Sequence, residues 1–353
     1  MTQGGRLQAL SIACTTPDAL LEWLPESVYR YHFNVDGDGA ERCVAHNTID
    51  RLRENIGKVF FGQSKAVDLL LIGLLARGHV LIEDVPGVGK TVLARALARS
   101  IDCKFSRIQL TPDLLPADVL GVSVYNNLTQ TFDFKPGPVF ANVILADEIN
   151  RTTPRTQSAL LEAMSEEQVS IENQTFALRR PFMVIATQNP FEFEGTYHLP
   201  ENQLDRFLLK ISVGYPERHA EQRIITTQPG RTALEHLTAV TDAQQVVELQ
   251  DRLSSVKTDP AVVEYILDLV DATRQSEELH LGVSPRGALA LTHASQAAAV
   301  LAGRDYVLPD DAKELFIATC AHRVVGKSYL HNGDAHGTEG ILKKILELVP
   351  APT

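Results

Sequence analysis

The sequence predicts an α/β fold in which a doubly wound parallel sheet of five strands is followed by a smaller all-helical domain. Three observations predict it. Five short apolar runs alternate with helical patterns as far as residue 215, a glycine-bearing loop joins the first run to a helix, and only helical periodicity follows residue 216. At roughly 150 residues per domain, a chain of 353 residues has room for both parts.

The predicted sheet region covers residues 47–215. Helical spacing of apolar residues comes first, over 47–60 and 63–76, and the strand-like runs follow it. Continuous apolar strands that alternate with helices are typical of a parallel sheet covered by helices on both faces. The five runs are Val80–Ile82, Phe105–Leu110, Val143–Ala146, Phe182–Ala186 and Leu208–Val213.

The predicted helical domain covers residues 216–353 and begins at Pro216, where a polar, charged stretch interrupts the alternation. Residues 1–46 lie outside both parts as an N-terminal extension of open role, with a strand-like run at 28–35. The helical patterns of the C-terminal region lie at 243–256, 261–274, 285–302, 310–325 and 338–348.

Composition and charge exclude several classes of protein. Lys and Arg number 33 and Asp and Glu 44, so the formal net charge is −11 at pH 7, which counts against a ligand that is mainly nucleic-acid phosphate. A hydrophobic content of 44% excludes a largely disordered chain. The longest apolar stretch, 69–76, is shorter than the roughly 20 residues that span a bilayer, and the N-terminus has no signal-peptide block, so we expect a cytoplasmic protein. The four cysteines are scattered, which favours free thiols over disulfides or a zinc site.

The strongest chemical signal is a phosphate-binding loop between a buried strand and a helix. The segment from Val80 to Thr91 reads VLIEDVPGVGKT, which has the strand, loop and helix order that a P-loop requires. Its glycines let consecutive N–H groups point at phosphate oxygens, and the helix N-terminus adds the positive end of its dipole. We expect Lys90 to reach the outer phosphates of ATP and Thr91 to join a Mg²⁺ shell. The expected cradle is Val85, Pro86, Gly87, Val88, Gly89, Lys90 and Thr91.

One position departs from the usual pattern of this loop, because Asp84 stands where the first glycine is expected. Asp tolerates unusual backbone angles better than most residues, so we expect the cradle to persist. The alternative is a glycine-rich turn that binds nothing. It is disfavoured because a second motif lies where phosphate chemistry needs it.

That second motif is the carboxylate pair Asp147 and Glu148, at the end of the strand-like run that begins at Val143. Ligands of doubly wound sheets bind at the carboxyl ends of the strands. Two adjacent carboxylates beside a buried edge are costly without a nearby cation, and Mg²⁺ supplies one. We therefore expect Asp147 to hold the metal shell and Glu148 to polarise the attacking water.

Three further polar residues complete a hydrolysis site if the fold is doubly wound. Asn189 follows the run at 182–186 and is suited to bond the γ-phosphate or to orient water. Arg206 lies just before the last strand, and Arg286 lies in the first turn of a predicted helix that Ser284 and Pro285 start. Each is weak evidence alone, since an Arg at a helix end is usually solvated, but their order and context favour function.

A histidine pair in the helical region is interpreted as part of an exposed polar loop and not as a metal site. His331 and His336 flank a glycine-containing stretch, and no further ligands of suitable spacing accompany them. No Ser-His-Asp or Cys-His arrangement can be argued from chain order alone.

Together these motifs resemble those of the AAA+ ATPases, and within them the MoxR family, over about residues 47–348. Residues 60–63 (FFGQ) resemble the family segment near which adenine packs, and Asp84 is within MoxR usage. The family's Walker A, Walker B, sensor 1, arginine-finger and sensor 2 motifs correspond in order to Glu83–Thr91, Asp147–Arg151, Ala186–Pro190, Leu204–Phe207 and Ser284–Arg286.

Two more segments resemble hairpins that related AAA+ proteins insert into this fold. One covers 116–134 and the other 168–178, and the resemblance implies that both point toward the pore of a ring. Their predicted tips, Tyr125–Thr129 and Ile171–Thr175, contain no Lys or Arg.

The resemblance implies a Mg²⁺-dependent ATPase that works as a ring, most often a hexamer. Lys90, Mg²⁺ and Arg286 would stabilise charge within one subunit, Glu148 and Asn189 would position the water, and Arg206 would act on the neighbour's ATP. The ring would remodel client proteins beside a partner with a von Willebrand factor A domain. Two alternatives stay open: a nucleic-acid motor of the same clade, which the uncharged hairpin tips disfavour, and a slow nucleotide-gated assembly switch.

Overall fold

The computed structural model describes residues 37–171, 174–189, 196–197, 199–227, 230–327 and 336–352. The chain divides into two compact units, residues 1–44 and 45–353, and the sheet and the site belong to the second. Three expectations lie outside the described residues: the strand at 28–35, the second hairpin's tip at 172–173, and the polar loop at 331–335.

The centre of the fold is a sheet of five parallel strands that coincide with the five apolar runs of the sequence. Their order across the sheet is β2-β5-β8-β1-β9, and each neighbouring pair is parallel. The strand order places the carboxyl ends of β1, β5 and β8 side by side, where such sheets bind ligands. The strands are β1 (Val80–Glu83), β2 (Phe105–Gln109), β5 (Val143–Asp147), β8 (Met183–Gln188) and β9 (Leu209–Ile211).

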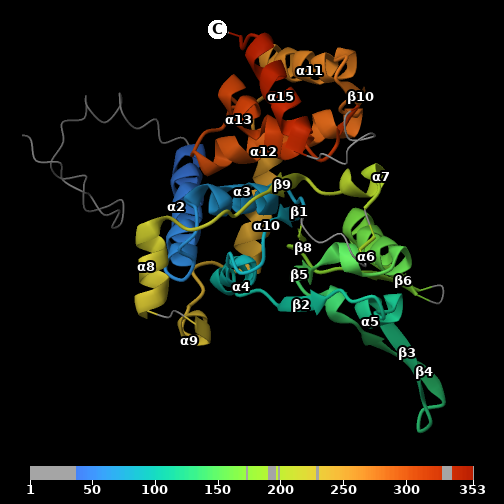
Figure 1. Ribbon diagram of the computed structural model, residues 1–353. Helices are drawn as coiled ribbons and strands as arrows, with labels where there is room; N and C mark the ends of the chain where they lie inside the picture. The colour runs from blue at the N-terminus through green and yellow to red at the C-terminus, as the bar shows by residue number, and fades with distance from the viewer. Residues whose placement is uncertain are drawn as a thin grey trace, which may run out of the picture. The chain divides into compact units, whose positions relative to one another are not determined.

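Helices cover both faces of this sheet (Figure 1). The first and third residues of β1 pack in one apolar cluster with α3 (Ser64–Leu75) and α4 (Lys90–Ser100). Leu81, which lies between them, packs in a second cluster with α6 (Pro154–Glu166). Burial of both faces explains why the strands are apolar throughout, and it confirms the doubly wound architecture. The helices ahead of and between the strands also include α2 (Gly37–Gly57), α5 (Pro116–Leu120), α7 (Glu201–Leu204) and the short η2 (Pro138–Phe140) and η3 (Ile149–Arg151).

Two antiparallel hairpins extend from this region, as the resemblance implied. Phe134 of the first hairpin stacks on Phe176 of the second, with ring centroids 4.4 Å apart, and Phe140 contacts both rings edge to face. The first hairpin projects away from the sheet in Figure 1, and Leu128 at its turn is 95% exposed. The paired strands are β3 (Gly121–Asn126) with β4 (Thr131–Pro136), and β6 (Gln168–Ile171) with β7 (Gln174–Ala177).

The C-terminal region is helical apart from one short antiparallel pair, β10 (Leu279–Leu281) and β11 (Val325–Gly326). These strands are too short to be seen as periodic runs in the sequence. The helices α8 and α9 were not predicted, because their stretch is polar and reads as a boundary. The helices are α8 (Arg218–Thr227), α9 (Gly230–Glu235), α10 (Ala243–Arg252), η4 (Leu253–Ser255), α11 (Pro260–Gln275), α12 (Pro285–Leu301), α13 (Pro309–Cys320) and α15 (His336–Leu348).

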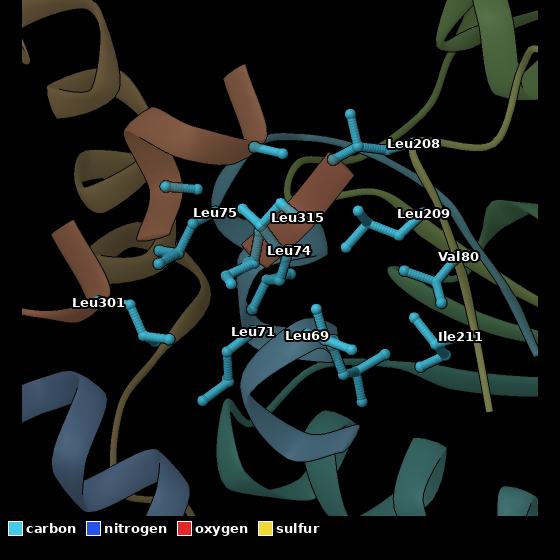
Figure 2. Close-up of a cluster of buried hydrophobic side chains, with 14 of the residues drawn as sticks. Leu69, Leu71, Leu74, Leu75, Val80, Leu208, Leu209, Ile211, Leu301 and Leu315 are labelled. Atoms are coloured by element: carbon cyan, nitrogen blue, oxygen red, sulfur yellow. The ribbon is translucent and has the colours of Figure 1, made fainter. Parts of the chain in front are cut away.

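Helix α3 connects the sheet to the helical region through a shared core. Figure 2 shows its leucines between the sheet residues Val80, Leu209 and Ile211 and the helical residues Leu301 and Leu315. The side-chain amide of Gln250 in α10 also donates to a carbonyl oxygen of α3, at 2.6 Å. The helices that follow the sheet are therefore packed onto it and not merely tethered to it.

None of the described helices is both long enough and apolar enough to span a membrane.

Candidate active site

The phosphate loop leaves β1 at Glu83 and enters α4 at Lys90, as the sequence indicated. Gly87 and Gly89 have φ angles of 90° and 95°, a left-handed conformation that a side chain would strain. Gly89 is also the residue before α4, and a Cβ there would lie 3.5 Å from the ring of Phe60. These two glycines let the backbone turn back over the helix N-terminus, where anions bind.

Asp84 acts through its carboxylate and not through an unusual backbone angle. Its φ is not among the positive values of the described residues, so the expected reason for an Asp at this position was wrong. The side chain is buried, and its Oδ2 accepts from Ser212 Oγ (2.9 Å), Val213 N (2.8 Å) and Gly214 N (2.7 Å). The loop is thereby tied to the residues that follow β9. The carbonyl oxygen of Asp84 accepts from Lys90 Nζ at 2.7 Å.

Asp147 ends β5 with both carboxylate oxygens engaged. Thr187 of β8 donates its hydroxyl to Oδ1 at 2.6 Å. The guanidinium of Arg107 on β2 donates to Oδ2 from Nη2 at 2.5 Å and from Nε at 3.1 Å. The Asp147 side chain is 14% exposed, so this charge is balanced by an adjacent cation as burial requires.

Glu148 follows in the left-handed region, with φ 59° and ψ 54°. A non-glycine residue in this region is uncommon and often lies at a functional site. Its N–H donates to Thr187 Oγ1 at 3.0 Å, so one threonine holds both acidic residues. Its Oε2 accepts from Gln109 Nε2 at 3.0 Å and pairs with Arg151 Nε at 3.2 Å. These contacts fix the direction of the Glu148 carboxylate.

These groups line one cleft with a volume of about 350 Å³. It brings together the loop, the helix N-terminus and the carboxyl ends of β5 and β8, and its lining includes every residue predicted for the phosphate loop except Val85 and Val88. Val85 donates its N–H to Asp84 Oδ1 at 2.8 Å, and Val88 is buried in the apolar core. The N–H of Val85 is therefore already engaged, whereas burial of the Val88 side chain leaves its backbone N–H available, so phosphate binding by Val88 stays a prediction. The lining residues are Pro86, Gly87, Gly89, Lys90, Thr91, Val92, Arg107, Asp147, Glu148, Thr187, Gln188 and Asn189.

The donor set of this cleft fits Mg²⁺ bound together with a nucleotide. Thr91 and Asp147 offer a hydroxyl and a carboxylate oxygen, the hard ligands that Mg²⁺ prefers. Among the described residues, no group of three or more His, Cys, Asp or Glu side chains could hold a metal by itself. A site with so few protein ligands matches Mg²⁺, which takes its remaining ligands from phosphate and water.

Arg206 does not line the cleft. Its Nη1 donates to Leu161 O (2.7 Å) and to Ser165 Oγ (2.6 Å), both in α6. The nearby Leu208 donates its N–H to the carbonyl of His79, just ahead of β1, at 2.8 Å. Arg206 therefore lies at the edge of the sheet where the strands begin, whereas the cleft lies where they end.

Arg286 lies at that same edge. It is exposed in the first turn of α12, and a Cβ on the next residue, Gly287, would be 3.0 Å from Cδ of Arg323. Arg323 in turn donates to the carbonyl of Leu208 at 3.1 Å. A strand of four residues, about 13 Å, separates this edge from the cleft. The expectation that Arg286 stabilises charge at its own subunit's ATP does not fit this arrangement.

Comparisons with known proteins agree with this geometry. A model of the ATPase family associated with various cellular activities (AAA) matches residues 79–209, and an AAA lid domain model matches 271–345. The protein named Chaperone MoxR1 from Mycobacterium tuberculosis is 41% identical over 328 residues, 89% of this chain and 85% of the relative. The chain belongs to the MoxR family of AAA+ ATPases. It binds nucleotide and hydrolyses ATP.

Other relatives cover the MoxR-family chain to a similar extent. A Bacillus subtilis protein named YeaC is 48% identical over 310 residues, which are 87% of this chain and 96% of the relative. A protein named MoxR from Methylorubrum extorquens is 30% identical, covering 86% and 94%. The crystal structure of a proposed ATPase from Cytophaga hutchinsonii shares 37% identity, covers 90% of this chain and 98% of its own, and has a TM-score of 0.82.

Three residues that contact Asp147 or Glu148 in this MoxR-family site were not identified from the sequence: Thr187, Arg107 and Gln109. Thr187 lies within the segment Ala186–Pro190 that resembles sensor 1, but no role was predicted for it. Arg107 and Gln109 alternate along β2, and this alternation in an otherwise apolar sheet was a signal that one face of the strand's end meets the cleft.

Proposed function

We propose that this MoxR-family ATPase requires Mg²⁺, assembles into a ring, a hexamer, and uses hydrolysis to remodel partner proteins. The observation that carries the proposal is the convergence of Lys90, Thr91, Asp147, Glu148 and Asn189 on one cleft. The cleft thus contains a cation suited to bind phosphate, two oxygen ligands suited to a metal ion, a carboxylate suited to activate water and an amide suited to orient that water. Phosphoryl transfer needs positioning and charge stabilisation far more than covalent chemistry.

Each side chain of the cleft has a distinct part in the proposed reaction. Lys90 and the N–H groups of the glycine loop bind the phosphates, while Thr91 and Asp147 hold the metal ion. Glu148 accepts a hydrogen bond from the attacking water, and Asn189 orients that water or the γ-phosphate. Mg²⁺, when bound, neutralises charge that develops on the phosphate oxygens.

The placement of Arg206 supports its action on a neighbouring subunit. Its side chain is on the edge of the sheet opposite its own cleft, so it is suited to approach a cleft that another copy presents. Arginine fingers supplied in trans contribute about 10³–10⁵ in rate. Arg286 shares this edge, which favours contact with a neighbour's phosphate over its own. A ring gives every cleft such a neighbour.

Three variants test the enzymatic part of the proposal. Lys90→Ala should lose nucleotide binding, while Glu148→Gln should bind ATP and lose about 10²–10⁴ in turnover, the usual contribution of general acid–base catalysis. Arg206→Ala should keep ATP binding and lose turnover. Glu264→Gln, an exposed change in α11, is the matched control. Unchanged turnover per subunit in Arg206→Ala would show that the trans assignment is wrong.

The remodelling part of the proposal has two supports. A relative is named a chaperone, and the first hairpin exposes apolar side chains, Leu128, Phe132 and Tyr125, where a polypeptide chain could be contacted. The predicted partner is a protein with a von Willebrand factor A domain, as the family resemblance implies. Capture of protein by Glu148→Gln with ATP but not with ADP would support this role.

Two other measurements separate the alternatives. A nucleic-acid motor should bind DNA with steep salt dependence, which the net charge of −11 and the turn at 127–130, free of Lys and Arg, disfavour. A slow assembly switch should oligomerise fully with ATP while turning over far more slowly than it assembles. Either result would replace remodelling as the function of the cycle.

A further inference from the structure

A buried arginine from the helical region grips the segment that carries Arg206. Arg323 follows α13, and its side chain is 3% exposed. Its Nε donates to Asp205 Oδ1 at 2.7 Å, its Nη2 to the carbonyl of Phe207 at 2.7 Å, and its Nη1 to the carbonyl of Leu208 at 3.1 Å. The residues on both sides of Arg206 are therefore bound to one guanidinium. We call these hydrogen bonds of Arg323 to residues 205, 207 and 208 the grip.

A second buried side chain strengthens the same contact. His322 donates its Nε2–H to the carbonyl of Phe207 at 2.9 Å. Desolvation by burial lowers the pKa of His322 well below its usual value, and the adjacent charge of Arg323 lowers it further. The imidazole is therefore neutral at neutral pH, so it adds a hydrogen bond without adding a second positive charge.

The grip lies beside Arg286, which connects it to the start of α12. Gly287 lacks the Cβ that would come within 3.0 Å of Arg323, so α12 can approach closely. Burial lowers the pKa of Arg323, the ion pair with Asp205 raises it, and the nearby charge of Arg286 lowers it. A guanidinium stays charged at neutral pH in any case, so a buried positive charge depends on Asp205 for its counter-ion.

We propose that Arg323 is a positioning residue that couples the helical domain to the finger Arg206. The bonds fix the backbone at 205, 207 and 208, so the direction in which Arg206 leaves the chain follows the position of α13. A movement of the helical domain in one protomer thereby changes the finger presented to the adjoining protomer. This inference rests on the proposed trans role of Arg206.

If Arg323 had only a structural role, loss of the grip would lower the stability of the protein without a specific effect on turnover in a neighbouring subunit. Loss of a similar ion pair elsewhere in the helical domain would then have the same effects. Arg304 offers the comparison, because it donates to both carboxylate oxygens of Asp311, at 2.9 and 2.6 Å, and to the carbonyl of Tyr306, all within the helical region. Arg304→Lys is therefore the matched control for Arg323→Lys.

The test mixes two kinds of full-length subunit in one assembly. The reporter subunit carries Arg206→Ala, so it binds ATP but offers no finger. The helper subunit carries Lys90→Ala, so it offers a finger but binds no ATP. Neither should turn over ATP alone, and mixing should restore turnover at the reporter's clefts. Helpers that also carry Asp205→Asn or Arg323→Lys then measure the finger's position apart from nucleotide binding.

We expect helpers that also carry Asp205→Asn or Arg323→Lys to restore at least about tenfold less turnover than the Lys90→Ala helper alone. This loss is smaller than the factor of about 10³–10⁵ that a whole finger contributes, because the finger is misplaced and not removed. Helpers with Arg304→Lys should restore it fully, and Asp205→Glu, which keeps the carboxylate, should recover most of the loss. Thermal unfolding and assembly size confirm that each helper is folded. The KM for ATP at the reporter should not change.

Two results would overturn the proposal, and they are distinguishable. If helpers with Asp205→Asn and Arg323→Lys restore turnover as well as Lys90→Ala alone, the grip does not position the finger. If Lys90→Ala itself restores nothing to the reporter, Arg206 does not act in trans, and the coupling fails together with that assignment.

Discussion

The hydroxyl of Thr187 donates a 2.6 Å hydrogen bond to Oδ1 of Asp147. The hydroxyl oxygen of Thr187 also accepts the N–H of Glu148 at 3.0 Å, so one residue of β8 aligns the carboxylate proposed to hold the metal and the backbone of the residue proposed to activate water. Replacing a side chain that orients a metal ligand typically lowers metal affinity or activity by about 10–100-fold.

Replacing this threonine should therefore impair hydrolysis without disturbing the fold. We expect Thr187→Val, which keeps the shape and removes the hydroxyl, to lower ATP turnover or Mg²⁺ affinity by about 10–100-fold. Steady-state turnover as a function of Mg²⁺ concentration measures both. Thr187→Ser keeps the hydroxyl and should retain most activity. Unchanged turnover and Mg²⁺ dependence in Thr187→Val would contradict the role assigned to these hydrogen bonds.

Restoring the usual glycine of the loop should weaken this protein. In Asp84→Gly the hydroxyl of Ser212 and the N–H groups of Val213 and Gly214 lose their acceptor. A buried donor without a partner costs about 1–3 kcal/mol, so we expect a loss of at least that size in the free energy of unfolding. Urea denaturation measures it. Ser212→Ala removes one bond and should cost about 1 kcal/mol, and a fully stable Asp84→Gly would contradict the assigned role.

Acid should destabilise the fold partly through His79. Its Nε2 donates to Met164 O at 2.9 Å and its Nδ1 accepts from Val184 N at 3.0 Å, so a proton on Nδ1 would face another donor. Burial lowers its pKa from 6.5 to about 4, although Met164 and Glu167 raise it. Between pH 6.5 and about pH 4, His79 is therefore protonated in the unfolded chain and neutral in the folded chain.

The stabilising effect of neutral His79 is complete above pH 6.5 and is lost as the pH falls toward 4. At about 1.4 kcal/mol per pKa unit, it amounts to about 3 kcal/mol. Chemical denaturation between about pH 4.5 and about pH 7.5 should show most of this loss. His79→Asn should have a shallower pH dependence. An unchanged slope would assign the acid sensitivity to His322, whose pKa is also lowered by burial.

The two hairpins should be energetically coupled through Phe134 and Phe176. Their rings stack with centroids 4.4 Å apart and planes at 22°, and aromatic pairs of this kind contribute about 0.5–1.5 kcal/mol beyond burial. A double-mutant cycle with Phe134→Leu and Phe176→Leu, followed by thermal unfolding, should yield a coupling energy in that range. Tyr125→Leu with Phe176→Leu serves as an uncoupled comparison, since Tyr125 contacts Phe132 instead. Additive effects in both cycles would contradict coupling of the hairpins.

Local patterns in the sequence predicted the sheet, the phosphate loop and the acidic strand end. The strands are apolar because both faces are buried, and the loop needs its glycines at 87 and 89 because the backbone adopts positive φ there. Such signals lie within a few neighbouring residues. They therefore predict where cleft residues lie without any knowledge of how distant segments pack.

The contacts that the sequence did not predict join residues far apart in the chain. Asp84 meets residues 212–214, Arg107 meets Asp147 and Arg323 meets Asp205, pairings that depend on strand order and on where α13 ends. The edge on which Arg286 lies depends in the same way on how α12 packs. The motif around Arg286 indicates the chemistry that this residue can perform. The packing of α12 determines whether its side chain lies near the cleft of its own chain.

Strand β9 is only three residues long, about 10 Å, and it is anchored at both ends. Asp84 holds the residues that follow it, and Arg323 holds those that precede it. Hydrogen bonds to β1 along one side keep the strand from stretching or buckling. In the ring that we propose, a shift of the nucleotide loop would therefore pass along these three residues to the segment that carries Arg206, and so toward the neighbouring subunit.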